Sequence, residues 1–318
     1  MTVTEPGLLV AMIDGKVKHG GLCDRFKGII SLYAYSKVAG RKFKIRYTSP
    51  FLLEKMLQPS SYDWALREGE YSDYPGSYRI LYMRKEYKGR RLFRLTTRKQ
   101  VHFYSNRDML PAINLMMQEK GIEGRVEWGS LFKELFKPSP NLEKHIKEMK
   151  KITGENYLAA VFRFQNLLND FNEYHFRPLE SEEKQQKLIT KCLYVVRKLR
   201  SIHNEYPLLV TSDSRKFLDK ASEIEGVVTI PGRLIHVDMS QESLDGEPTD
   251  ADFKSFTDFY MLSGARKIYR VGTSQMYPSE FPLYAAKLNN VPFETLDPDE
   301  WLEMPKENLN RNDNGNYS

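Results

Sequence analysis

Between residues 157 and 296, short apolar runs alternate with longer segments whose apolar residues recur at helical spacing. Continuously apolar runs of four to eight residues are typical of strands buried on both faces of a parallel sheet. The pattern predicts strands at 157–164, 208–211, 227–230, 267–271 and 291–296, separated by helices at 181–202, 215–224, 252–263 and 280–288. Alternation of this kind is typical of a parallel sheet that carries helices on both faces. We therefore expect an α/β fold with a doubly wound parallel sheet.

The start of the chain predicts a second unit of the same kind. The apolar run at 8–13 is followed by His19, Gly20 and Gly21, by helical spacing over 24–38 and by an alternating strand at 42–47. Residues 50–110 show no clear period, and helices are predicted at 111–119, 130–136 and 141–151. At about 150 residues per domain, 318 residues favour two domains. We place the boundary at residue 153, with domains at 1–153 and 154–306 and a polar tail at 307–318.

Cysteine content and the N-terminal residues bear on location. Cys23 and Cys192 are the two cysteines, too few for a disulfide framework, which favours a reducing compartment. The first apolar run spans six residues and follows no basic segment, so we expect neither a cleavable leader nor a membrane span there. We expect a cytoplasmic protein.

Positive charge is concentrated in one segment. The net charge is +6, and residues 79–107 contain ten Lys or Arg and one acid, so this segment carries +9 and the remainder −3. Such a surface attracts phosphates of a nucleic acid, an anionic membrane or a diphosphate substrate. A solvated, basic antiparallel strand pair explains the same residues. Because no nucleic-acid motif accompanies the segment, we expect no nucleic-acid partner and leave peripheral association with an anionic membrane as an alternative.

Polar residues follow each predicted strand of the second half, where ligands of parallel sheets bind. Each has a structural alternative: Arg163 could pair with Asp170, the serines could cap helices, and a His near an Asp could be a surface pair. The candidate binding residues are Arg163, Asn166, Asp170, Ser212, Asp213, His236, Asp238, Ser274, Ser279 and Phe281.

In the first half, the candidates lie in the glycine loop and the start of the helix after it. Paired glycines at 20 and 21 let a backbone approach a ligand closely, with His19, Asp24 and Arg25 beside them. The loop lacks the G-x-G-x-x-G pattern and a P-loop lysine, and the chain has no G-x-S-x-G elbow, so dinucleotide, P-loop and hydrolase chemistry have little support. We expect no metal site.

Four segments resemble the GDP-fucose-dependent fucosyltransferases, a superfamily of two-domain GT-B enzymes that includes the α-1,2, α-1,6, nodulation and protein O-fucosyltransferases. They are HGGLCDRFKGI, AAVFRFQNLLNDF, LLVTSDS and DFYMLSGARKIYRVGTSQMYPSEFPLYAAKL. The family's His-x-Arg-Arg-Gly-Asp/Glu pattern is here VFRFQN, and its GG-x-x-Asn-Gln pattern has Asp24 and Arg25. These departures concern the donor sugar more than the fold.

The resemblance implies two Rossmann-like domains facing a cleft, the first on the acceptor side and the second binding a nucleotide sugar. It implies that Arg163 neutralises the leaving diphosphate, that Gly20 and Gly21 approach it, and that Ser212 and Asp213 contact the nucleotide. Ser279 and Phe281 would form a late phosphate seat.

The expected activity is metal-independent, inverting transfer of fucose from GDP-fucose, without a further cofactor, to a glycan or lipid-linked glycan in polysaccharide biosynthesis. Asp24 is the candidate general base, with Asp14 and His19 as alternatives. The alternative functions are a GT-B transferase using another nucleotide sugar and a basic protein that binds nucleic acid or an anionic membrane.

Overall fold

The computed structural model describes residues 7–74, 78–82, 99–171, 176–237 and 245–303. The chain forms two compact units. Unit 1 comprises Met1–Lys144 and His236–Phe253, and unit 2 comprises His145–Ile235 and Lys254–Ser318. Residues 145–153 thus belong with unit 2 and residues 236–253 with unit 1, which differs from a single division at residue 153. The difference arises because the segment after β9 packs back onto unit 1, so that Leu52 donates its backbone N–H to the Gly246 carbonyl at 2.9 Å.

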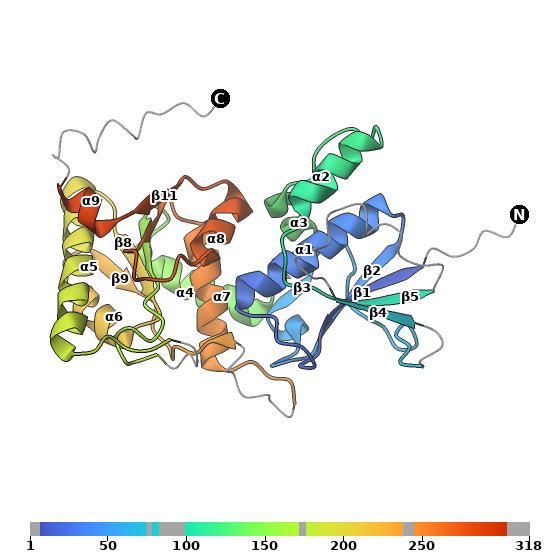
Figure 1. The fold of residues 1–318 in the computed structure, drawn as a ribbon, viewed down its shortest axis with the longest axis horizontal. Coiled ribbons are helices and arrows are strands. Elements are labelled where there is room, and N and C mark those ends of the chain that lie inside the picture. The colour runs from blue at the N-terminus through green and yellow to red at the C-terminus, as the bar shows by residue number, and fades with distance from the viewer. Residues whose placement is uncertain (1–6, 75–77, 83–98, 172–175, 238–244, 304–318) are drawn as a thin grey trace, which may run out of the picture. The chain divides into compact units, whose positions relative to one another are not determined.

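Unit 2 is built on a parallel sheet, as predicted. Over its described residues, five strands lie in the order β11-β10-β7-β8-β9 and every neighbouring pair is parallel. α5 lies on one side of the sheet and α7 and α8 on the other (Figure 1). The strands are β7 (Leu158–Phe162), β8 (Leu208–Ser212), β9 (Val227–Thr229), β10 (Ile268–Val271) and β11 (Phe293–Leu296). The helices are α5 (Glu182–Ile202), α6 (Arg215–Ser222), α7 (Asp250–Ser263), α8 (Phe281–Asn289) and α9 (Pro298–Glu303).

Alternation of side chains explains how one strand serves two apolar layers. Ala160 and Phe162 of β7 join the core formed with α5, α6 and α9, in which Cys192 and Phe217 are buried. Their neighbours Ala159 and Val161 are also buried, so β7 is covered on both faces. Ser181 caps α5, because its hydroxyl accepts the Lys184 backbone N–H at 3.3 Å. The apolar run of β7 and the serine before α5 thus agree with the burial of the strand and the start of the helix.

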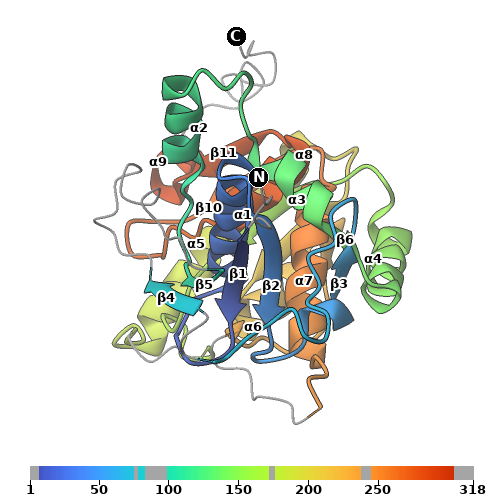
Figure 2. The same cartoon turned by 90° about the vertical axis from the view of Figure 1, so that its right-hand side faces the viewer.

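Unit 1 contains a smaller parallel sheet. In the described part of this unit, four strands lie in the order β2-β1-β5-β4 and point the same way (Figure 2). β1 (Leu8–Ile13) and β2 (Lys42–Tyr47) match the prediction, whereas β4 (Tyr78–Tyr82) and β5 (Gln100–Tyr104) come from the stretch without a clear period. β4 and β5, which lie at the two ends of the basic segment, are parallel to each other. Residues 83–98, which hold most of the basic segment, lie outside the described residues.

One face of this sheet packs on α1 (Leu22–Val38), which is buried along most of its length. Tyr33 of α1 contacts Phe43 of β2, with ring centroids 5.4 Å apart. The remaining elements of unit 1 are α2 (Leu110–Glu119), α3 (Trp128–Leu135), a short antiparallel pair of β3 (Leu57–Pro59) and β6 (Phe136–Pro138), and the 3₁₀ turn Leu53–Lys55. α4 (Pro140–Thr153) carries the chain into unit 2.

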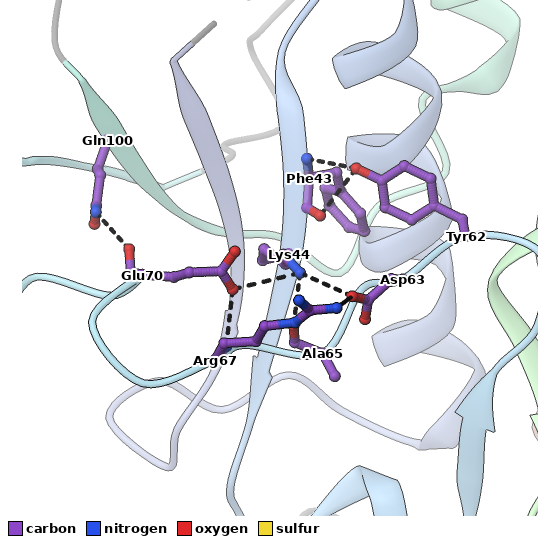
Figure 3. Close-up of polar contacts among 8 residues, drawn as sticks. All are labelled: Phe43, Lys44, Tyr62, Asp63, Ala65, Arg67, Glu70 and Gln100. Carbon is purple, nitrogen blue, oxygen red and sulfur yellow. Dashed lines mark hydrogen bonds and ion pairs between the residues drawn. The ribbon is translucent and has the colours of Figure 1, made fainter. Parts of the chain in front are cut away.

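The other face carries polar side chains covered by a loop instead of a helix. Lys44 of β2 is 9% exposed, and its ammonium donates to the Ala65 carbonyl at 2.7 Å and faces Asp63 and Glu70 at 3.6 and 3.4 Å (Figure 3). Arg67 completes the cluster by pairing with Asp63 at 2.6 Å, and these cations hold the pKa of Asp63 below its usual value against the effect of burial. Lys44 is the buried charge of the cluster, and its two carboxylate partners meet the condition for burying a charge at modest cost.

No helix in the described residues combines the length and apolarity needed to span a bilayer.

Candidate functional site

The strand order of unit 2 singles out one place on its sheet. From β7 the chain proceeds to β8 and β9 on one side and then returns to β10 and β11 on the other, so β7 and β10 are adjacent strands whose connections run in opposite directions. This pair of strands is the switch point of the sheet. Loops leaving the two strands diverge, and the space at the carboxyl ends of the strands is where open α/β sheets bind ligands. The loops after β7 and β10 therefore form the candidate site.

Arg163 directly follows β7 and is held by a buried carboxylate. Its Nη1 lies 2.9 Å from Oδ2 of Asp213, which follows β8 and is 6% exposed. The Asp213 oxygens also accept the backbone N–H groups of Phe164 and Gln165 at 2.8 and 2.7 Å. The guanidinium lies over the Phe171 ring at 4.8 Å. The Asp213 carboxylate therefore positions Arg163 and the loop after β7, and its expected contact with the nucleotide stays a prediction.

Burial raises the pKa of Asp213, whereas Arg163 and the two amides act in the opposite direction and favour the carboxylate. The Arg163 side chain is one-fifth exposed, so part of it is reachable from solvent. This arrangement suits an anion that needs oriented N–H donors.

Asp170 and Ser212 support the loop after β8. The Asp170 carboxylate accepts the Ser214 hydroxyl at 2.8 Å and the Lys216 backbone N–H at 2.9 Å, so its partner is the start of α6 instead of Arg163. The Ser212 hydroxyl accepts the Ser214 backbone N–H at 3.1 Å. Ser214, which the sequence analysis did not single out, is the residue that caps α6. Asn166 donates to the Phe176 carbonyl at 2.9 Å and closes the loop after β7.

The loop after β10 leads into α8. Ser274 is exposed, and the Ser279 hydroxyl accepts the Phe281 backbone N–H at 3.3 Å just before the helix. The Phe281 ring packs edge-on against Phe259 of α7, with centroids 5.8 Å apart. Phe281 therefore anchors the helix start through its side chain, and its N–H is engaged by Ser279.

The remaining candidates lie in unit 1. Gly20 has φ +83°, and a β-carbon there would lie 2.5 Å from the Asp24 carboxylate, which itself pairs with Lys27 at 2.8 Å. Arg25 is buried and donates to the Gly20 and Ser49 carbonyls at 3.3 and 2.8 Å, so it ties the glycine loop to the end of β2.

His19 is buried against Tyr104, and its Nδ1 lies 3.3 Å from the Ser105 carbonyl. The α-carbon of Gly21 faces His236, because a β-carbon on this glycine would lie 3.8 Å from Nε2 of that ring. Asp238 lies outside the described residues.

Two aromatic side chains at the site were missed by the sequence analysis. Phe176, in the loop after β7, and Tyr277, in the loop after β10, are both exposed and lie with ring centroids 6.3 Å apart. Neither has a local signal, since an aromatic residue in a polar loop is common, and their proximity depends on β10 pairing with β7. In the described residues, no group of three or more His, Cys, Asp and Glu is arranged to hold a metal ion.

No protein-family model matches the sequence, and no curated protein is similar enough in sequence to match. Solved structures do match. A variant of Arabidopsis thaliana FUT1 in complex with GDP has a TM-score of 0.58 and 12% identity, over 92% of this chain and 70% of that one. Fucosyltransferase NodZ from Bradyrhizobium has a TM-score of 0.55 and 11% identity, over 89% of this chain and 92% of that one. The α-1,6-fucosyltransferase NodZ soaked with GDP-fucose has a TM-score of 0.53 and 12% identity, over 90% and 93%.

At sequence identities this low, the matches show a shared fold and no more. The predicted α/β class, with a parallel sheet in each unit, is confirmed. The chain therefore has a GDP-fucose fucosyltransferase-like fold, as the sequence resemblance implied.

Proposed function

We propose that this protein is a glycosyltransferase whose unit 2 binds a nucleotide-sugar donor. The observation that carries the proposal is the placement of Arg163 at the switch point between β7 and β10, fixed by the buried carboxylate of Asp213. The fold supports it, because similar structures were solved with GDP and with GDP-fucose. By that likeness the proposed donor is GDP-fucose, and the proposed acceptor is a glycan or lipid-linked glycan.

The proposed chemistry follows from what a held arginine does for a leaving diphosphate. As the glycosidic bond to the donor phosphate breaks, negative charge grows on the diphosphate oxygens. A guanidinium that is already oriented stabilises this charge without reorganising in the transition state. Its charge is permanent, so the role needs no metal ion. We therefore propose metal-independent transfer with inversion, in which the acceptor hydroxyl attacks opposite the leaving diphosphate.

Asp24 is the proposed general base. Its carboxylate is 40% exposed at the start of α1, and Lys27 keeps it in a defined position 2.8 Å away. A carboxylate in this setting can accept the proton of an acceptor hydroxyl.

Arg163→Ala tests the assignment of the diphosphate site. We expect at least about a hundredfold loss of transfer from GDP-fucose, because one preorganised donor to developing charge contributes on that scale. Arg163→Lys should recover little, since an ammonium lacks the fork that meets Asp213 and a phosphate together. Arg197→Ala, an exposed arginine on α5, is the matched control and should keep full activity.

Full transfer by Arg163→Ala would contradict the assignment of the diphosphate site. Loss of all activity on addition of EDTA would contradict the proposal that transfer needs no metal ion. Donor identity is tested by thermal unfolding with GDP, UDP, dTDP and CMP. A ligand that binds the native state at 100 times its Kd stabilises it by about 2.7 kcal/mol, so GDP should raise Tm most. A larger shift with UDP would favour a transferase that uses another nucleotide sugar.

A further inference from the structure

Two exposed aromatic rings meet in the loops that follow β7 and β10, two inner strands of the unit 2 sheet. Phe176 is 38% exposed and Tyr277 is 50% exposed, and their rings lie edge to face at 66° with centroids 6.3 Å apart. They are about a hundred positions apart in the chain and come together because β7 pairs with β10. Large apolar rings left in contact with water gain none of the free energy that burial supplies, and exposed apolar surface at a candidate site is typical of a place where a ligand binds.

The backbone under both rings is fixed by the loops that carry them. The Phe176 carbonyl accepts the side-chain amide of Asn166 at 2.9 Å, which ties it to the loop containing Arg163. On the other loop, the Tyr277 carbonyl accepts the Ser279 N–H at 2.8 Å, and the preceding Met276 is buried in the core beside Cys192. The Phe176 and Tyr277 carbonyls are thus each held by a hydrogen bond within the unit 2 loops.

The pair lies where the strand order predicts a ligand. Phe176 and Tyr277 belong to the two loops that diverge at the switch point, and Arg163 opens the first of these loops. The carboxyl end of the sheet thus offers a cation for an anion and, separately, the exposed faces of two aromatic rings. A nucleoside diphosphate has both complementary parts, a charged diphosphate and a flat aromatic base.

We propose that Phe176 and Tyr277 form a stacking platform for the base of the nucleoside diphosphate donor. The inference deepens the proposed function and rests on it. Aromatic rings stack on any base through its π-face, so the platform supplies affinity, and a purine gains more than a pyrimidine because its surface is larger.

The test compares a ligand with a base and one without. Calorimetric titration with GDP, and competition of inorganic pyrophosphate against GDP, are measured for the wild-type protein, Phe176→Ala and Tyr277→Ala. We expect the Kd for GDP to rise about tenfold in each alanine variant, the scale of one lost stacking contact, with pyrophosphate affinity unchanged. Tyr277→Phe, which keeps the ring, should bind GDP like the wild type.

Tyr194→Ala removes another exposed aromatic ring, on α5, and is the matched control. Equal GDP affinity in the wild type and both alanine variants would overturn the platform and leave the proposed function standing. A parallel loss of pyrophosphate binding would show that the rings support the loops instead of stacking on a base, and would also overturn it. If the wild-type protein binds neither GDP nor another nucleoside diphosphate, the proposed function itself fails.

Discussion

Single residues show how far local chemistry can be inferred from sequence. Arg163 is a candidate because of its position after a predicted strand, and in the structure it directly follows the carboxyl end of β7. Its partner could not be inferred, because Asp170 and Asp213 are both acids in loops that follow predicted strands. Asp213 is the partner since it follows the neighbouring strand β8, whereas Asp170 is engaged by α6. Sequence spacing identifies the charge, and strand pairing selects its counterion.

His102 of β5 gives a prediction at the same scale. Its ring is stacked on Tyr71 and Tyr78, with centroids 4.7 and 4.2 Å away, and the Arg46 guanidinium lies over the Tyr71 ring, 4.4 Å from its centroid. Burial, aided by the positive charge of Arg46, lowers the pKa of His102 to about 4 from its ordinary value of 6.5. Between pH 6.5 and about pH 4 the unfolded chain therefore binds a proton at His102 that the folded chain does not. The free energy of unfolding keeps its full value above pH 6.5 and decreases as the pH falls from 6.5 to about 4.

We expect the wild-type protein to lose about 2 kcal/mol more free energy of unfolding between pH 7 and 4.5 than His102→Phe, which keeps the stack without titrating. Urea unfolding at both pH values measures the difference. Equal losses in the two proteins would show that His102 is protonated freely in the native state.

Helices and strands were predicted well where the hydrophobic period agreed with the glycine, proline and capping residues at the ends of the element, and poorly where it did not. β1, α1 and β2 match the expected unit, but β4 and β5 were missed because their stretch mixes tyrosine, arginine and proline without a sustained alternation. β5 becomes a strand by pairing with β1 and β4 on its two edges, a contact between segments distant in sequence. Such pairing overrides weak local preference.

Gly28 shows what an element needs for its packing. It lies within α1, where alanine would favour the helix by about 1 kcal/mol. A β-carbon there would lie 1.9 Å from the backbone carbonyl oxygen of Ser105, just after β5. We expect Gly28→Ala to lower the free energy of unfolding by about 2 kcal/mol or more, because backbone must move to admit the methyl group.

Gly272→Ala is the control, since a β-carbon at this position would meet Met276 at an ordinary 3.7 Å. Urea unfolding measures both variants. If Gly28→Ala were as stable as the wild type, α1 would not pack this closely on the residues after β5.

At the scale of the whole molecule, the division into units and the strand order matter most. The switch point between β7 and β10 defines the candidate site and explains why Phe176 and Tyr277 meet. Neither property is visible in the order of elements along the chain, because the same alternation of strands and helices is compatible with several strand orders.

The proposed donor site predicts where ligand binding is felt. With saturating GDP, hydrogen exchange should slow at residues 163–171 and 272–281, because binding to the native state suppresses local opening of those loops. Strand β5 of unit 1 should exchange as it does without ligand. Protection confined to residues 19–25 instead would place the nucleotide in unit 1 and contradict the assignment of the donor to unit 2.

The sequence by itself determined the α/β class, most of the elements of unit 2 and the resemblance to fucosyltransferases. These follow from periodicity, caps and short motifs, all of which act within a few residues. Tertiary structure decided the strand order, the pairing of Arg163 with Asp213, the return of residues 236–253 to unit 1 and the meeting of the two exposed rings. Each of these depends on contacts between segments far apart in the chain, whose free energies arise only once the sheets have assembled.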